Sequence, residues 1–465
     1  MFQWRVLNGD YVGHLGLALA HPLYIAAGRA LMLVARDQLP LLLNAFSGLG
    51  MAVALANIAA VVAVLTGRVR AGLIAAATLA FAHTAWWLAT IAEIYTWSLA
   101  GFTAEVWLLA LLLRRPRWHL LVGLALVNGL GLCVHNFALL GLPVYVLATV
   151  ALVARRRLAA WALAAAAGAW VVGAGLYLAM TVHLAVTGGS WTNAAVSALV
   201  GRYGRQVLNV TTPSRQWKAN VVFSAMNFIG LLLPLAVIGW ARLSKRVGGP
   251  TALALAGLTV IHVVFFLRYP VPDQFTFILP TLAMMTVAAG IGASVVMDIS
   301  SMWRRGLYAL CLLSLVWQPA VFAAAPKLAR RLAPAMVKVR TPGRDEARYW
   351  LVPWKHNEDS ARRFANAALS QASPDGVIIP DSTCGHPLKL AQEIQGIGAG
   401  VIVQFAGSPI ASRDLTEANI RSVFAGRALY VVSDKPGYAP KDILNGAQLD
   451  RPEGSLLFRV KWTEK

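Results

Sequence analysis

Residues 39–66 read LPLLLNAFSGLGMAVALANIAAVVAVLT, a stretch without a single charged side chain. A helix needs about 20 consecutive apolar residues to cross the hydrocarbon core of a bilayer, which is about 30 Å thick. Comparable apolar runs recur along the chain, separated by short polar connections. The sequence therefore predicts a polytopic α-helical membrane protein with about ten spanning helices, at roughly 39–66, 71–90, 95–113, 119–135, 137–154, 158–182, 221–243, 250–268, 275–298 and 306–325.

The composition agrees with this fold class. Hydrophobic residues make up 58% of the 465 residues and charged residues only 13%, whereas charged residues are about 25% of an average soluble domain. The formal net charge of +21 raises the question of a nucleic-acid partner. Much of the excess, however, lies in short clusters between apolar runs, which mark cytoplasmic loops. We therefore expect a lipid bilayer and no nucleic acid as a partner; the clusters are Arg68 and Arg70, Arg114-Arg115-Pro116-Arg117, Arg155-Arg156-Arg157, Lys245-Arg246 and Arg304-Arg305.

The basic clusters recur at every second connection, which sets the expected topology. The outer loop 1–38 and the long outer loop 183–220 then lie on the non-cytoplasmic face of a transmembrane domain formed by residues 1–325. The chain would also begin on that face without a spanning helix of its own. This suggests that one N-terminal helix is missing.

The composition changes abruptly after residue 326, where 14 of the 20 acidic residues are found. Strand-like and helix-like segments alternate there, which predicts a small soluble α/β domain at 326–465. An even number of spanning helices places it on the same side as the loop 1–38, so that it is exported. Strands are predicted at 377–380, 401–405 and 428–432, and helices at 388–395 and 415–424.

The few carboxylates of the membrane domain are the first candidates for chemistry, because ionisable groups are costly near a bilayer. Asp10, Glu93 and Asp273 map to the outer face, together with Asp37. Asp10 is either a general base at the mouth of a cavity or a solvated loop residue. Glu93 lies among interface aromatics, where it is either functional or snorkels to the membrane surface. Asp273 is either functional or paired with the nearby Arg268.

Histidines and arginines on the same face form a second set. Guanidinium groups match phosphate oxygens bidentately, so these residues are candidates for binding a phosphate at the membrane surface. Contact with lipid headgroups is the alternative. The set comprises His21, Arg29, His135 and Arg202, with Arg205 and Arg215.

No cofactor or metal site is predicted. His14 and His21 are seven residues apart, but no third ligand has the spacing of a metal site. The glycine-rich residues 396–400 follow a predicted helix and precede a strand, the reverse of a nucleotide-binding loop. We predict a turn there.

Several short segments resemble, together and in order, one family: the transmembrane O-mannosyltransferase-like proteins of the GT-C glycosyltransferase superfold. The tail from Asp345 to Trp354 is similar to the exported tail of bacterial members. The matching segments cover most of residues 1 to 290, and they are Gly9-Asp10, His21-Pro22-Leu23-Tyr24, Asn44-Ala45-Phe46-Ser47, Ala92-Glu93-Ile94-Tyr95, Val134-His135-Asn136, and Tyr269-Pro270-Val271-Pro272-Asp273 with Pro280.

This resemblance implies the GT-C fold in a multi-pass protein of the bacterial inner membrane. It implies transfer of a mannose-like sugar from a polyprenyl-phosphate donor to a hydroxyl of a protein or glycan acceptor on the non-cytoplasmic face. It assigns the base to Asp10, with Glu93 as the second candidate, and it brings Tyr269 and Asp273 to the substrate.

The chemistry fits these residue types. A lipid phosphate is a good leaving group, so the protein must chiefly orient the acceptor, remove its proton and neutralise the departing phosphate. The rival classes are a lipid flippase or transporter and a non-catalytic membrane scaffold. Transporters often show paired inverted repeats, whereas the ionisable residues here gather at one face.

Overall fold

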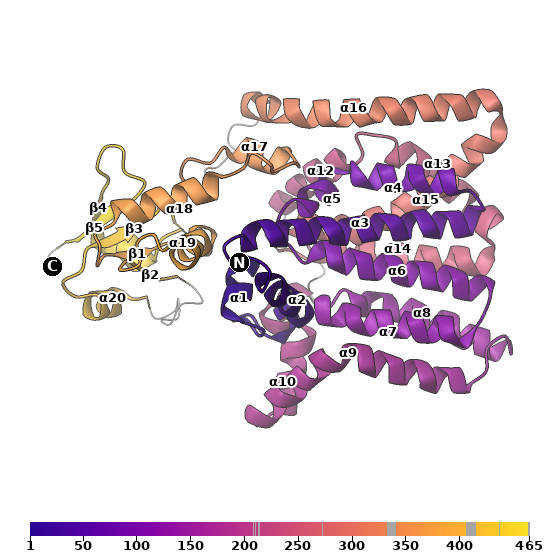
Figure 1. The fold of residues 1–465 in the computed structure, drawn as a ribbon, viewed down its shortest axis with the longest axis horizontal. Coiled ribbons are helices and arrows are strands. Elements are labelled where there is room, and N and C mark those ends of the chain that lie inside the picture. Colours follow the sequence, from indigo (N-terminus) through magenta and orange to yellow (C-terminus); the bar gives the residue numbers. More distant parts are fainter. Residues whose placement is uncertain are drawn as a thin grey trace.

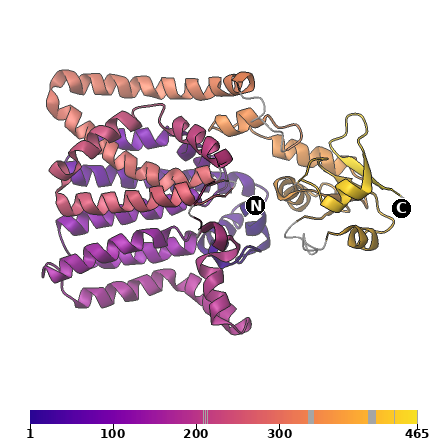
Figure 2. The same cartoon turned by 180° about the vertical axis from the view of Figure 1, so that it is seen from behind.

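The computed structural model describes residues 1–207, 209, 211–212, 214–271, 273–332, 341–405, 415–436 and 438–463. Long helices lie side by side in a bundle, and a smaller unit with a β-sheet lies beyond one end of it (Figure 1). The view from behind places the N-terminus between the bundle and this unit (Figure 2). The N-terminal segment and the C-terminal unit therefore lie at the same end of the bundle.

The helices of the bundle and its ends are α1 (Phe2–Asn8), η1 (Leu17–Leu19), α2 (Pro22–Met32), α3 (Leu39–Thr66), α4 (Val69–Ala80), α5 (His83–Ala89), α6 (Tyr95–Arg114), α7 (Trp118–Val134), α8 (Ala138–Ala154), α9 (Trp161–Thr187), α10 (Trp191–Leu199), η2 (Gly201–Tyr203), α11 (Gly204–Val207), α12 (Ser214–Asn227), α13 (Leu232–Val247), α14 (Gly249–Arg268), η3 (Gln274–Ile278), α15 (Leu279–Ile299) and α16 (Ser301–Leu332). Six helical stretches among the described residues are long and apolar enough to span a membrane, or eight if two bent pairs are counted. The helices α7 and α8 are apolar but 17 residues long.

Two of the predicted helices are bent rather than continuous. The predicted helix 71–90 is divided into α4 and α5, which meet at 75°, and the predicted helix 221–243 is divided between α12 and α13, at 88°. The two breaks satisfy each other's polar groups. The Thr84 backbone N–H donates to Asn227 Oδ1 at 2.8 Å, and Asn227 Nδ2 donates to Thr84 Oγ1 at 3.0 Å. These bonds compensate for the helical ones that the breaks remove.

Polar side chains also join helices inside the bundle. Glu105 on α6 accepts hydrogen bonds from Tyr145 Oη on α8 at 2.8 Å and from Asn128 Nδ2 on α7 at 3.2 Å. At one end, Asp298 accepts from Arg68 and, at 2.6 Å, from Arg246, which ties α15 to the start of α4 and the end of α13. The 28 residues of α3 rise about 1.5 Å each, so that this helix is about 42 Å long. It ends two residues before Arg68, and the basic end therefore lies about 42 Å from the start of α3.

The C-terminal unit contains α17 (Glu346–Leu351), α18 (Ser360–Gln371), β1 (Val377–Ile379), α19 (Ser382–Gln395), β2 (Ile402–Val403), α20 (Glu417–Val423), β3 (Leu429–Val431), α21 (Lys441–Gly446), β4 (Ala447–Asp450) and β5 (Phe458–Trp462). The strand order is β2-β1-β3-β5-β4. The three predicted strands are present, and β1 pairs in parallel with β2 and β3. The sequence analysis missed the antiparallel strands β4 and β5. The residues after α19 form the predicted turn, in which Gly396 has a positive φ of 68°.

The helices α13 and α15 approach each other closely where two glycines face the opposite backbone. A Cβ on Gly239 would come within 1.8 Å of the Ala288 carbonyl oxygen, and a Cβ on Gly292 within 2.0 Å of the Leu235 carbonyl oxygen. Small residues allow helix backbones to approach in this way inside membranes.

We predict that Gly239→Ala destabilises the bundle by about 1–3 kcal/mol, because a methyl group there forces the two backbones apart. Thermal unfolding of the purified protein in detergent measures the effect. Gly306→Ala on α16 is the matched control, since no atom lies within 4 Å of the place that its methyl group would take. Equal melting temperatures for the two variants would contradict the packing argument.

Candidate active site

A cavity of about 1180 Å³ lies where the N-terminal segment, the ends of the bundle helices and the C-terminal unit meet. Its lining mixes apolar residues with a concentration of ionisable ones. The cavity is at the end of α3 opposite the Arg68–Asp298 contact, because Gln38 and Asn44 line it. The ionisable lining residues are His14, His21, Asp37, Glu93, Tyr95, His135, Tyr203, Tyr269, Asp273, Arg344, Tyr349, Glu358, Asp359, Arg362 and His386.

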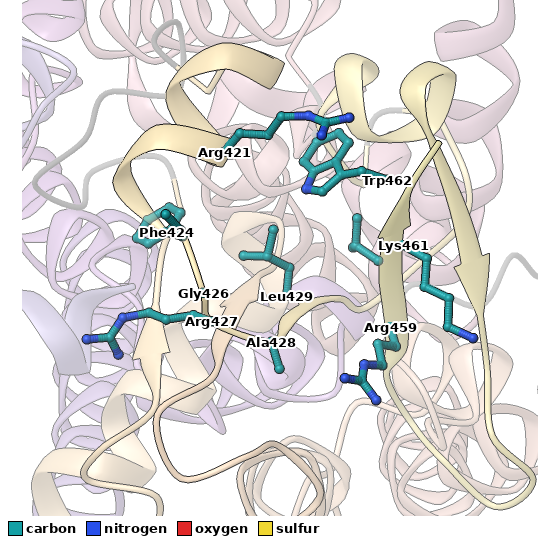
Figure 3. A pocket seen from close by; sticks show the side chains of 11 residues that line it. Arg421, Phe424, Gly426, Arg427, Ala428, Leu429, Arg459, Lys461 and Trp462 are labelled. Carbon is teal, nitrogen blue, oxygen red and sulfur yellow. The ribbon is translucent and has the colours of Figure 1, made fainter. Parts of the chain in front are cut away.

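A second cavity, of about 470 Å³, lies against α20, β3 and β5 of the C-terminal unit (Figure 3). Its lining is strongly basic, but partners within the unit already engage three of its cations. Arg421 pairs with Glu417 at 2.9 Å, Lys461 pairs with Asp450 at 2.8 Å, and Arg427 donates to a backbone carbonyl oxygen at 2.8 Å. The larger cavity is therefore the better candidate for an active site.

Two carboxylates from the bundle, Glu93 and Asp273, line the larger cavity. The backbone of Glu93 is fixed to α3, since its N–H donates to Ser47 Oγ and Ser47 Oγ donates to its carbonyl oxygen, both at 3.1 Å. Asp273 accepts a hydrogen bond from Tyr95 Oη at 3.2 Å. Arg268, the alternative partner for Asp273, instead donates to the carbonyl oxygens of Val207 and Asn209.

The surroundings of both carboxylates favour their protonated forms. Desolvation, followed by the negative charge of Asp273, raises the pKa of Glu93 to about 8. Desolvation also raises the pKa of Asp273. A glutamate with a pKa near neutral can exchange a proton at physiological pH. Such a shifted carboxylate in a cavity is a common feature of catalytic sites.

Two neutral histidines form another part of the lining. The rings of His21 and His135 stack with centroids 5.2 Å apart. Desolvation, followed by the charge of the partner ring, lowers the pKa of His21 well below its usual value, and desolvation lowers the pKa of His135 to about 3. His21 Nδ1 lies 2.8 Å from the Val134 carbonyl oxygen, and His135 Nδ1 accepts from the Phe137 backbone N–H at 3.1 Å. These contacts assign opposite tautomers to the two rings, which leaves a lone pair on His21 Nε2 and an N–H on His135 Nε2.

The backbone of His21 is strained, because its φ of 54° is rare for a residue other than glycine. Arg5, which is buried, stabilises this conformation. Its guanidinium donates to the carbonyl oxygens of Leu19 at 3.0 Å and Ala20 at 2.6 Å. Backbone strain of this kind is often found at functional sites.

Asp10 lies beside Arg5 rather than in the cavity lining. Its Oδ2 is 3.6 Å from Arg5 Nε, and its Oδ1 accepts from the Gly13 backbone N–H at 2.7 Å. Its side chain is 45% exposed. Asp10 therefore stabilises the turn between α1 and η1.

The other predicted residues are divided between cavity and surface. Tyr269 lines the cavity and packs edge-on against Phe277 at 4.9 Å. Arg29 donates to the Val6 carbonyl oxygen at 3.3 Å, and exposed Arg202 uses its backbone N–H to bond Leu15. Neither of these arginines is part of the lining. The side chain of Arg215, together with Pro272 of the motif ending at Asp273, lies outside the described residues.

The sequence analysis did not predict the contribution of the C-terminal unit. Arg344, Tyr349, Glu358 and Arg362 line the cavity, as does His386 of α19. The signal available in the sequence was the resemblance of the tail from Asp345 to Trp354 to bacterial tails. Among the described residues, no group of three or more metal-binding side chains is found.

Comparison with known proteins places this geometry in context. Residues 16–158 match the family model of the protein O-mannosyl-transferase TMEM260 N-terminal domain. No sequence among curated proteins matches the chain. The fold matches the crystal structure of ArnT from Cupriavidus metallidurans bound to undecaprenyl phosphate, with a TM-score of 0.58 and 13% identity over 99% of this chain and 91% of that one. The predicted fold class is thus confirmed: this chain is a helical membrane protein with the fold of ArnT, a GT-C glycosyltransferase, and a small C-terminal sheet, and its residues 16–158 resemble the O-mannosyl-transferase family.

Proposed function

We propose that this protein transfers a mannose-like sugar from a polyprenyl-phosphate donor to a hydroxyl group of a protein or glycan acceptor. The observation that carries the proposal is the cavity in which Glu93 and Asp273 meet neutral histidines at one end of a GT-C bundle. The undecaprenyl phosphate bound to ArnT supports a lipid-linked phosphate as the donor class. The match to a protein O-mannosyl-transferase family supports the sugar and the reaction type.

The proposed reaction is a single displacement. The acceptor oxygen attacks the anomeric carbon of the sugar and forms a new C–O bond. The bond from that carbon to the phosphate oxygen breaks, and the polyprenyl phosphate leaves with the electron pair. A carboxylate of the protein takes the proton of the acceptor hydroxyl. The configuration at the anomeric carbon is therefore inverted.

Of the two candidate bases, the geometry favours Glu93 over Asp10. Glu93 lines the cavity, and its pKa of about 8 suits proton transfer near neutral pH. Asp10 pairs with Arg5 and is turned toward solvent. We assign to Asp10 the positioning of the turn that precedes His21, and to Asp273 an electrostatic role beside Glu93. The Nε2–H group of His135 is a donor for an oxygen of the sugar or phosphate.

We further propose that the cavity and residues 341–463 face the periplasm of a bacterial inner membrane. The basic residues Arg68 and Arg246 gather at the opposite end of the bundle, where they bond Asp298. Lysine and arginine are enriched in cytoplasmic loops. This orientation gives the site access to exported acceptors.

We predict that Glu93→Gln lowers the transfer rate by about 10²- to 10⁴-fold, the usual cost of removing a general base. Glutamine keeps the shape of the side chain but cannot take the proton. Sugar transfer from a polyprenyl-phosphate mannose donor is measured in detergent. Asp10→Asn is the comparison, and its loss is expected to be smaller. An inactive Asp10→Asn beside an active Glu93→Gln would give the base role to Asp10. Full activity of both variants would rule out the proposed mechanism. If the wild type moves a lipid across the membrane but transfers no sugar, the protein is a flippase instead.

The pH dependence provides a second prediction. The base must be deprotonated, so kcat/KM should rise with pH until about 8 and then level off. Asp273→Asn removes a negative charge that raises the pKa of Glu93, and the rising limb should therefore shift to lower pH. If the pH profile of kcat/KM is the same in this variant as in the wild type, the charge of Asp273 does not act on the group whose titration sets the profile. The measurement is kcat/KM between pH 5 and 10, at constant ionic strength.

The orientation can be tested by labelling with a membrane-impermeant maleimide after replacement of the three native cysteines. We expect Glu453→Cys to react in intact spheroplasts and Arg156→Cys to react only after permeabilisation, because the two positions lie on opposite sides of the membrane. The reverse pattern would invert the proposed topology.

A further inference from the structure

The charged groups around the large cavity come from different parts of the chain, and the C-terminal unit supplies two carboxylates, Glu358 and Asp359, as well as arginines. The bundle and the loop before α3 contribute carboxylates, which include Asp37, Glu93 and Asp273. Among the described lining residues, the only arginines are Arg344 and Arg362, and no lysine is present. The permanently positive groups at the cavity thus come from the C-terminal unit.

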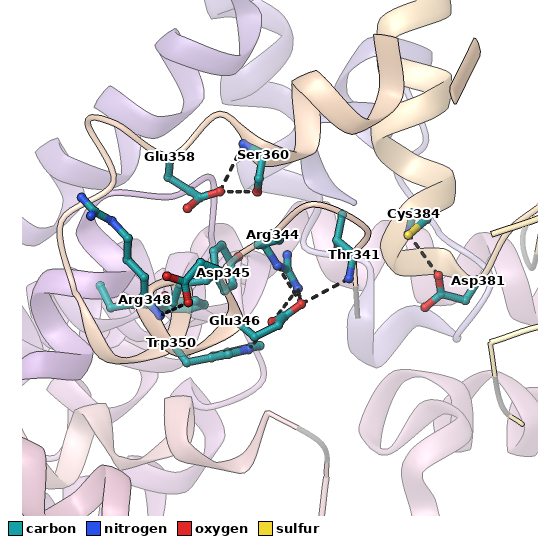
Figure 4. A network of polar contacts seen from close by, with 12 residues as sticks. Thr341, Arg344, Asp345, Glu346, Arg348, Trp350, Glu358, Ser360, Asp381 and Cys384 are labelled. Atoms are coloured by element: carbon teal, nitrogen blue, oxygen red, sulfur yellow. Dashed lines mark hydrogen bonds and ion pairs between the residues drawn. The ribbon is translucent and has the colours of Figure 1, made fainter. Parts of the chain in front are cut away.

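Arg344 is held in one orientation by Glu346 (Figure 4). Its Nε and Nη2 atoms donate to the carboxylate of Glu346 at 2.8 to 3.0 Å. The two side chains are only 7% and 2% exposed. The guanidinium carbon also lies 4.1 Å from the centre of the Tyr349 ring. Within the described part of the chain, no hydrogen bond of Arg344 Nη1 is found. Because Arg344 lines the cavity, Nη1 is the nitrogen that remains available to a ligand.

The carboxylate of Glu346 is itself fixed from two further directions. It accepts from the Thr341 backbone N–H at 3.2 Å and from Trp350 Nε1 at 3.0 Å. The Trp350 ring stacks on Trp87 of α5, with centroids 5.4 Å apart and planes 17° apart. A continuous chain of contacts therefore positions Arg344 relative to the bundle.

Arg362, the other arginine of the lining, is held loosely. Its side chain is 65% exposed, and its Nη2 lies 3.5 Å from the carboxylate of Asp359. A flexible, solvated ion pair of this kind contributes little binding energy. Arg362 therefore serves as a matched comparison for the buried Arg344.

We propose that Arg344 binds the phosphate group of the lipid-linked donor and stabilises it as it leaves. This inference rests on the proposed function and adds the residue that neutralises the leaving group. When the bond between the anomeric carbon and the phosphate oxygen breaks, the oxygen gains negative charge, and a preorganised guanidinium stabilises that charge. Arginine suits the task because its planar fork matches phosphate oxygens while its other edge stays bonded to Glu346.

The proposal is tested by binding rather than by turnover. The full-length protein in lipid nanodiscs is titrated with undecaprenyl phosphate, with undecaprenol and with inorganic phosphate. The wild type should prefer the lipid phosphate over the alcohol by about tenfold or more, as expected for hydrogen bonds to a charged group. Arg344→Gln should lose this preference, and Arg362→Gln should keep it. A folded Arg344→Gln variant with the wild-type preference would overturn the proposal.

Two further results keep the outcomes separate. Glu346→Gln keeps an oxygen that can accept from Arg344 but removes the negative charge that offsets the guanidinium, so the preference for phosphate should rise. A folded variant with an unchanged preference would contradict the assignment even if Arg344→Gln does not fold. Equal Arg344-dependent binding of inorganic phosphate and lipid phosphate would mean a site for free phosphate and would overturn the lipid-linked assignment. If the wild type does not distinguish lipid phosphate from alcohol, the proposed donor class fails, whatever Arg344 does.

Discussion

The contact between Trp87 and the start of the C-terminal unit is the interaction on which the enclosed site depends. The Trp87 indole N–H donates to the Tyr349 carbonyl oxygen at 3.1 Å, and Thr90 Oγ1 donates to the Pro353 carbonyl oxygen at 2.9 Å. Aromatic stacking of the kind seen between Trp87 and Trp350 adds about 0.5–1.5 kcal/mol to the burial of the rings. The 75° bend between α4 and α5 is what brings Trp87 to this position. A straight helix over the same residues would continue along the bundle and would not bring Trp87 to Tyr349 and Trp350.

The electrostatic design of the cavity follows from this closure. Carboxylates and a guanidinium approach a common space from different parts of the chain, and apolar surroundings strengthen each charge effect. The histidine pair adds polarity without adding charge, because both rings are neutral at pH 7. In the proposed reaction, the acceptor hydroxyl meets Glu93 and the anionic phosphate meets Arg344, which come from different parts of the chain. The separation suits a reaction in which a proton and a phosphate leave in different directions.

The sequence predicted the helical part of the fold because length and hydropathy alone mark a spanning helix. It did not predict the bends beside Thr84 and Asn227, since these depend on hydrogen bonds between residues that are 143 positions apart. The strands β4 and β5 were missed because the predicted strands were identified as short apolar runs, whereas Phe458-Arg459-Val460-Lys461-Trp462 alternates between apolar and charged residues, the pattern of a strand that is buried on one face. Scarcity of charge identified Glu93 and Asp273. The same criterion could not identify Arg344, which lies in a segment rich in charged residues and is distinguished only by its burial.

The composition of the cavity has a consequence for the biogenesis of the protein. The last bundle residue of the lining is Phe277, and Arg344 follows 67 residues later, which at a synthesis rate of about 5–20 residues per second is a delay of about 3–13 seconds. During that time the bundle can insert and pack, but Glu93 and Asp273 lack the side of the cavity that the C-terminal unit forms. In the proposed orientation, the C-terminal unit must also cross the membrane before it can dock. Under the proposed function and orientation, a newly made molecule would bind no lipid-linked donor until its C-terminal unit has docked, so that the completion of export would itself switch on the site.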